Sequence, residues 1–141
     1  MATQRPVRYS LAMKIAAMPP LLLIAATALA DPPLLQVEQA ADGYVYAMAQ
    51  DGSTWLLDGG RRILLQDNHE LHPVGQGAGG VFWTAGDGIN YFALGGRLER
   101  LPVDATVFEV YPTDGGAYLH SAGPRLWWHD GRSVSAVTRA E

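Results

Sequence analysis

The feature that most constrains the fold of this chain is a segment that occurs three times. The copies open at Gly43, Gly80 and Gly116, at intervals of 37 and 36 residues. In each copy a glycine starts a short apolar run, a turn follows, and an aromatic residue comes next, at Trp55, Tyr91 and Trp127. Repeats of this length are typical of architectures in which small units stack on one another. We therefore expect three equivalent units.

Each copy reads as a series of short strands. Apolar and aromatic runs alternate with turn sequences such as Asp51-Gly52, Asp87-Gly88 and Gly95-Gly96, which is typical of β-hairpins. A further apolar stretch precedes each copy, and no stretch after residue 30 keeps a helical period over three turns. The sequence predicts an all-β chain of three four-stranded antiparallel units, at residues 34–65, 71–101 and 107–137.

These units resemble the blades of β-propellers, especially of exported sensor and regulator propellers. The shared pattern is a glycine followed by an aromatic, a glycine turn, another aromatic, and Asp-Gly before a final apolar residue. The resemblance implies propeller-like packing, although propellers close with about four to eight blades. Three alternatives stay open: an open arc of three blades, six blades formed by a dimer, or a β-trefoil. An open arc would leave its end sheets uncovered and favour a partner or self-association.

Residues 1–30 have the three parts of a secretory signal peptide. Arg5, Arg8 and Lys14 give a basic start, an apolar run follows, and Ala28-Leu29-Ala30 provides a small-x-small cleavage site. A membrane-spanning helix would need about 20 apolar residues, whereas this run is shorter and contains a Pro-Pro pair. We expect cleavage after Ala30, with residues 31–141 as the mature β-repeat domain; translation could also start at Met13.

The remainder of the chain is acidic and contains no cysteine. Residues 31–141 hold 7 arginines, no lysine and 14 acidic residues, a net charge of −7. This charge disfavours nucleic acid and anionic membrane as partners and is compatible with a basic protein. The lack of cysteine excludes disulfides, thiolate metal sites and a lipid anchor on cysteine. The bias toward Ala, Gly and Arg indicates a bacterial, GC-rich source, so we expect the periplasm.

No motif for catalysis stands out. None of the four serines after residue 30 lies in a nucleophile elbow: Ser53, Ser121, Ser133 and Ser135. Most aspartates precede glycine, where aspartate is favoured because its side chain bonds nearby backbone N–H groups. We therefore expect no enzyme and no cofactor.

The histidines could suggest a metal, but their spacing argues against one. His69 and His72 flank Glu70, and residues three apart on a strand point to opposite faces. His72 occupies a position held by Leu35 and Phe108 in the other units, which suggests the core, so we expect a buried or half-buried structural histidine. His120 and His129 are special to the third unit and could approach each other across a hairpin. No metal site is predicted.

Two loops and the third unit supply the candidate binding residues. The segment Gly75–Gly79 is interpreted as a flexible loop between units, and Ser121–Pro124 as a hairpin tip, either of which could enter a partner's cleft. Trp127 and Trp128 must face different environments, and the repeat assigns Trp127 to the core. The predicted binding residues are Gln76, Ser121, Arg125, Trp128, His129 and Asp130.

These observations favour a non-catalytic binding protein of the periplasm. In size, export and β-repeat style the chain resembles the periplasmic immunity proteins that protect bacteria from secreted peptidoglycan amidases. The resemblance implies an inhibitor that blocks a cell-wall-degrading enzyme, such as a basic murein hydrolase, by filling its cleft. The alternatives are a lectin-like carbohydrate or small-ligand binder, an envelope structural or assembly component, and a carboxylate-based hydrolase. A homodimer is compatible with each.

Overall fold

The computed structural model describes residues 31–139, so the predicted signal peptide lies outside the described residues. The described part is all-β and consists of twelve strands. No helix long and apolar enough to cross a membrane occurs within it.

The first sheet contains β1 (Leu34–Gln39), β2 (Val45–Ala49), β3 (Thr54–Asp58) and β4 (Arg61–Gln66). The second contains β5 (His72–Gly77), β6 (Gly80–Gly86), β7 (Ile89–Leu94) and β8 (Arg97–Arg100). The third contains β9 (Val107–Thr113), β10 (Gly116–Ser121), β11 (Arg125–His129) and β12 (Val134–Ala136).

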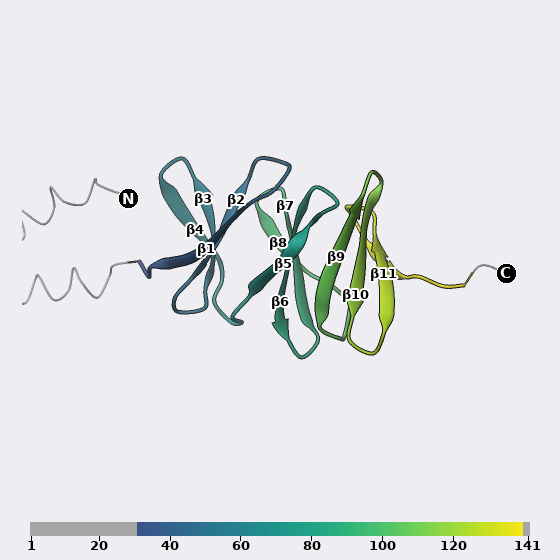
Figure 1. The fold of residues 1–141 in the computed structure, drawn as a ribbon. Helices are drawn as coiled ribbons and strands as arrows, with labels where there is room; N and C mark the ends of the chain where they lie inside the picture. Colours follow the sequence, from purple (N-terminus) through teal and green to yellow (C-terminus); the bar gives the residue numbers. More distant parts are fainter. Residues whose placement is uncertain (1–30, 140–141) are drawn as a thin grey trace, which may run out of the picture. The chain divides into compact units, whose positions relative to one another are not determined.

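Each unit forms its own antiparallel sheet, with the four strands side by side in chain order (Figure 1). No sheet in residues 31–139 closes into a barrel. A four-stranded meander of this kind is the strand order of a propeller blade. The prediction of three four-stranded, propeller-like units is therefore confirmed.

The pairing of the strands gives the repeat a uniform interval of 36 residues. Three pairs occupy the same place in the three sheets: Ala47 with Trp55, Trp83 with Tyr91, and Leu119 with Trp127. In this register the residue equivalent to Gly80 and Gly116 is Tyr44, so the predicted alignment of Gly43 with these glycines is wrong by one position. A Cβ atom at Gly80 or Gly116 would lie 2.2 Å from the carbonyl oxygen of Ala93 or His129, so only glycine fits there.

The two faces of each sheet have different neighbours. We call the face that carries Tyr46, Phe82 or Tyr118 the leading face, and the opposite face, which carries Trp55, Tyr91 or Trp127, the trailing face. One buried cluster joins the leading face of the first sheet to the trailing face of the second: Tyr46, Met48, Leu56, Val81, Trp83 and Ala93. A second cluster joins the second sheet to the third in the same sense: Phe82, Phe92, Ala117, Leu119 and Trp127.

Glycines in β5 let the second and third sheets approach closely. A Cβ atom on Gly77 would lie 2.7 Å from Cβ of Ala117, and one on Gly75 would lie 3.1 Å from Cβ of Val110. Residues 75–77 therefore belong to a strand that packs against β9, and only Ala78 and Gly79 form the turn. The prediction of a flexible loop at Gly75–Gly79 is wrong because these glycines serve packing between sheets.

The segment that links the second sheet to the third is held by one buried amide. Nδ2 of Asn90 donates to the carbonyl oxygens of Val103 and Ala105, at 2.9 Å each. Oδ1 of Asn90 accepts a hydrogen bond from the backbone N–H of Val107 at 3.1 Å. The linker is thus bonded to β7, and it places β9 against β5.

Candidate functional site

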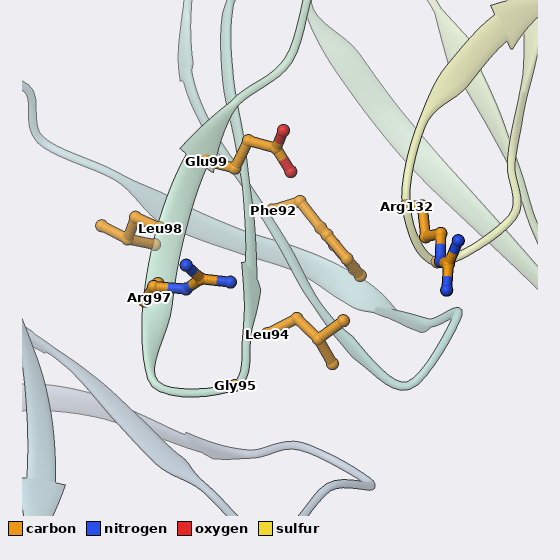
Figure 2. A pocket seen from close by; sticks show the side chains of 8 residues that line it. Phe92, Leu94, Gly95, Arg97, Leu98, Glu99 and Arg132 are labelled. Carbon is orange, nitrogen blue, oxygen red and sulfur yellow. The ribbon is translucent and has the colours of Figure 1, made fainter.

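A hollow of about 600 Å³ lies where the second sheet meets the third. It is lined from the second sheet by the β7–β8 hairpin and from the third by the turn between β11 and β12. The lining residues are Phe92, Leu94, Gly95, Arg97, Leu98, Glu99, Gly131 and Arg132. In Figure 2 the side chains of Phe92 and Leu94 extend from their strand toward the turn that carries Arg132.

Two tight turns place the arginines of this hollow. Gly95 and Gly96 adopt positive φ angles of 64° and 82°, which glycine tolerates at no steric cost, and Arg97 follows directly. On the other side, Oδ1 of Asp130 accepts hydrogen bonds from the backbone N–H groups of Arg132 and Ser133, at 2.8 and 2.9 Å. The N–H groups of Ser133 and then Arg132 lower the pKa of Asp130. This carboxylate therefore stays ionised and fixes the turn that presents Arg132.

The charges at the hollow differ from those of the domain as a whole. Two of the seven arginines after residue 30 line it, and they stand with one glutamate around an apolar floor. A guanidinium group binds a carboxylate through two parallel hydrogen bonds, and Glu99 disfavours ligands with several negative charges. The arrangement suits one carboxylate attached to an apolar or aliphatic body.

His129 lies beneath this hollow rather than at its surface. Its side chain has no exposed area, and its ring centre is 4.3 Å from that of Phe92 and 5.4 Å from that of Phe82. Nδ1 accepts a hydrogen bond from the N–H of Gly131 at 2.9 Å, so the geometry assigns the ring proton to Nε2, which has no partner. Burial lowers the pKa of His129, against the opposing effects of Asp130 and Glu99. The imidazole is therefore a neutral core residue.

The other predicted binding residues are not gathered at one place. Ser121 is buried and accepts a hydrogen bond from Nε1 of Trp127 at 3.0 Å. The Arg125 guanidinium lies 4.8 Å from the ring centre of Trp127 and 3.8 Å from the carboxylate of Asp104. Arg125, Trp127 and Asp104 line a smaller hollow of about 350 Å³ at the other end of β11.

Trp128 and Gln76 lie elsewhere again. Trp128 is on the leading face of the third sheet, where its ring centre is 4.9 Å from that of Tyr118. Gln76 is exposed on β5, and its Nε2 donates to Glu38 of the first sheet at 3.5 Å. Of the predicted binding residues, only Asp130 and His129 adjoin the larger hollow. Both accept hydrogen bonds from the backbone of the turn that carries Arg132.

The histidines lie in different environments. The side chain of His72 is half exposed, and its Nε2 lies 2.9 Å from the carboxylate of Glu70, so of the two predicted environments the half-buried one is found. His120 pairs with Leu126 on the leading face, whereas His129 pairs with Ala117 on the trailing face. The two therefore do not approach each other. Within residues 31–139 no three His, Cys, Asp or Glu side chains are grouped so that they could hold a metal ion.

The turn aspartates behave as their sequence positions predict. Asp42 accepts a hydrogen bond from the N–H of Tyr44 at 3.0 Å, and Asp51 accepts one from the N–H of Ser53 at 3.0 Å. Hydrogen bonds from the hydroxyl and then the backbone N–H of Ser53 lower the pKa of Asp51. These carboxylates stabilise the turns in which they lie.

No family model, curated protein or solved structure matches this chain. The chemistry of the hollow is therefore inferred from its own residues.

Sequence reasoning did not single out Arg97, Glu99 or Arg132. One signal could have pointed to Arg132. In the first and second units the second turn reads Gly59-Gly60 and Gly95-Gly96, whereas the third unit has Gly131-Arg132 at the equivalent positions. An arginine in place of a glycine in a tight turn marks a side chain that the turn presents.

Proposed function

We propose that the mature domain is an exported, non-catalytic binding protein that holds a partner protein of the periplasm. The observation that carries this proposal is the hollow between the second and third sheets, where Arg97 and Arg132 lie on opposite sides of Phe92 and Leu94. An acidic side chain of the partner would enter between the two guanidinium groups, and its aliphatic portion would cover the apolar floor.

Long-range charge and local charge would act at different stages of binding. The net charge of −7 of residues 31–141 favours encounter with a partner that is basic overall. The two arginines would then fix the register of the complex through one desolvated contact. A cell-wall-degrading enzyme is the partner that we propose to test first, because the signal-like leader and the resemblance to amidase immunity proteins point to the periplasm. Inhibition would be steric, by occupation of the enzyme's cleft.

The test is a binding experiment on protein exported by a bacterial host from the full chain. An Arg97→Gln/Arg132→Gln variant is compared with the natural chain and with Arg139→Gln, which lies after the last strand and does not line the hollow. We expect one stoichiometric partner from envelope extract, at least tenfold weaker binding for the double variant, and no change for Arg139→Gln. Equal binding of all three proteins would refute the role of the hollow, and a retained partner without murein hydrolase activity would refute the inhibitor assignment.

One observation favours carbohydrate as a second candidate ligand. Tyr118, which is 36% exposed, and the half-buried Trp128 form an aromatic pair on the leading face of the third sheet, and aromatic faces stack well against amphipathic ligands. Muropeptides and simple sugars that raise the melting temperature of the natural chain but not of Trp128→Ala would support this function. No thermal shift with any sugar would remove it.

A further inference from the structure

Two sheet faces lack the cover that equivalent faces receive elsewhere in the molecule. On the leading faces, Tyr46 of the first sheet and Phe82 of the second are 0% and 1% exposed, because the next sheet covers them. The equivalent residue of the third sheet, Tyr118, is 36% exposed. Within residues 31–139 no sheet follows the third.

The complementary surface is the trailing face of the first sheet. In the second and third sheets this face is buried against the preceding sheet, with Trp83 and Leu119 fully covered. In the first sheet the same face carries a row of side chains across all four strands: Val37, Ala47, Trp55 and Leu64. Val37 is 53% exposed and Leu64 46%, at the two edges of the row, whereas Ala47 between them is buried.

The covered interface between the first and second sheets has two specific hydrogen bonds. Oδ2 of Asp42 accepts from the backbone N–H of Gly95 at 2.8 Å. The hydroxyl oxygen of Tyr46 accepts from the backbone N–H of Gly96 at 2.9 Å. An aspartate and a tyrosine four residues apart on a leading face thus bind the two amides of a Gly-Gly turn at the edge of the next trailing face.

The acceptors and the donors of these two hydrogen bonds both have counterparts on the uncovered faces. Tyr118 lies on β10, 72 residues after Tyr46 of β2, and Asp114 lies in the turn before β10, as Asp42 lies in the turn before β2. Asp114 and Tyr118 are both exposed. The second sheet, whose leading face is already covered, has Ala78 and Phe82 there instead.

The matching donors are on the first sheet. The turn Gly59-Gly60 has φ angles of 55° and 89°, close to the 64° and 82° of Gly95-Gly96. Added Cβ atoms at Gly59 and Gly60 would meet nothing within 4 Å, whereas one at Gly96 would contact Tyr44 and Leu56. The turn has the geometry of the covered one and open space around it.

We propose that two copies of this chain associate head to tail through these faces. The leading face of the third sheet of one copy packs on the trailing face of the first sheet of the other, with Asp114 bound to the N–H of Gly59 and Tyr118 bound to the N–H of Gly60. Both contacts form twice, which gives a closed ring of six sheets. Six is the one multiple of three within the range of about four to eight blades in which propellers close.

This inference is independent of the proposed binding of a partner protein, because its contacts involve none of the residues that line the hollow at Arg97 and Arg132. Loss of self-association and loss of partner binding are therefore separable outcomes. The dimer would cover the pair of Tyr118 and Trp128, so the dimer and the carbohydrate candidate compete for one face.

The first experiment is light scattering coupled to size exclusion on protein exported from the full chain. We expect twice the chain mass at about 100 µM. Tyr118→Lys changes the leading face of the third sheet, and Val37→Lys changes the trailing face of the first. Ile63→Lys is the control, since Ile63 is similarly exposed but lies on the opposite face of the first sheet from Val37. Both face variants should be monomeric with an unchanged circular dichroism spectrum, and the control should stay dimeric.

Mixing the two face variants tests the head-to-tail geometry. The intact trailing face of Tyr118→Lys can still meet the intact leading face of Val37→Lys, so the mixture should form a heterodimer with one interface. A face-to-face dimer of two third sheets would instead be abolished by Tyr118→Lys alone and left intact by Val37→Lys. That result, or a natural chain that is monomeric at 100 µM, would overturn the proposal.

The two proposed hydrogen bonds, from the turn Gly59-Gly60 to Asp114 and Tyr118, can be tested separately from the geometry of the dimer. Asp114→Ala should raise the dimer dissociation constant about 10-fold to 100-fold, because a hydrogen bond to a charged acceptor is lost. Asp67→Ala, an exposed aspartate in the linker between the first and second sheets, is the matched control. The amides of Gly59 and Gly60 should exchange slowly with solvent in the dimer and quickly in Tyr118→Lys. Equal exchange in both proteins would refute the proposed contacts.

Discussion

The backbone N–H of Gly131 donates a hydrogen bond of 2.9 Å to Nδ1 of His129, whose ring is buried between the second and third sheets. A proton on Nδ1 would remove this acceptor and place a charge beside Phe82 and Phe92. The contact therefore requires the neutral imidazole, which agrees with the direction in which burial shifts its pKa.

The first prediction is that this contact makes stability depend on pH. The pKa of His129 in the folded protein lies below its ordinary value of 6.5, so just below pH 6.5 the unfolded chain binds a proton that the folded chain resists. The contribution to stability is complete above pH 6.5 and is lost as the pH falls toward the folded pKa. We expect the melting temperature to fall from pH 7.5 to 5.

The control for this prediction is His129→Asn, whose amide oxygen can still accept from Gly131 but does not titrate. His69, His72 and His120 remain in both proteins, so their contribution cancels. The variant should show a flatter dependence over the same range. Parallel curves for the two proteins would show that His129 is not the group responsible.

The second prediction concerns the close contact of Gly77 on β5 with Ala117 on β10. Gly77→Ala places a methyl group 2.7 Å from Cβ of Ala117 and should lower the free energy of unfolding by about 1–3 kcal/mol through overpacking. Ala117→Gly in the same chain should recover part of that loss, since it removes the opposing methyl group. The measurement is a double-mutant cycle by urea unfolding. An interaction energy near zero would contradict the packing described here, and Gly75→Ala, with its looser 3.1 Å approach, should cost less.

The third prediction concerns the hydroxyl of Ser121. It accepts the indole N–H of Trp127 inside the core, so Ser121→Ala should leave a buried donor without a partner and cost about 1–3 kcal/mol. Ser135→Ala, an exposed serine on the leading face of the same sheet, should change stability by less than about 0.5 kcal/mol. Guanidinium unfolding followed by tryptophan fluorescence measures both. Similar values for the two variants would be inconsistent with a structural role for Ser121.

The fourth prediction concerns the buried amide of Asn90. Asn90→Asp replaces the group that donates to the carbonyl oxygens of Val103 and Ala105 with a carboxylate that repels them. We expect a loss of more than about 3 kcal/mol at pH 7, where the variant leaves a buried charge with one donor, the N–H of Val107, and two repelling carbonyl oxygens. The loss should shrink toward pH 4 as the carboxyl protonates and can donate. Asn68→Asp, on the exposed linker, should have little effect at either pH.

Much of the fold could be read from local chemistry. The Asp-Gly and Gly-Gly turns fall where the hairpins are, and the aromatic positions Trp55, Tyr91 and Trp127 are equivalent in the structure. Turn geometry and alternation along a strand are properties of a few neighbouring residues, so a single sequence carries them.

Contacts between sheets could not be read in the same way. Gly75 and Gly77 resemble a flexible loop in sequence. Why glycine is needed at these positions becomes clear only when Val110 and Ala117 are placed opposite them. In sequence His72 aligns with Leu35 and Phe108, yet both of these are exposed, and strand pairing makes Gln36 the equivalent of His72 in the first sheet. The hollow depends on Arg97 and Arg132, which are 35 residues apart and meet only because the second sheet packs on the third.

Every strand pairs only with strands of its own sheet, so no backbone ladder ties one sheet to the next. The free energy that holds the sheets together is then a sum of interfaces between adjacent sheets, as in a one-dimensional lattice. The second sheet has two neighbours and should open last, while the first and third each have one and should fray first. Closure into a six-sheet ring would give every sheet two neighbours, and a stack with two weak ends would become one cooperative unit without ends.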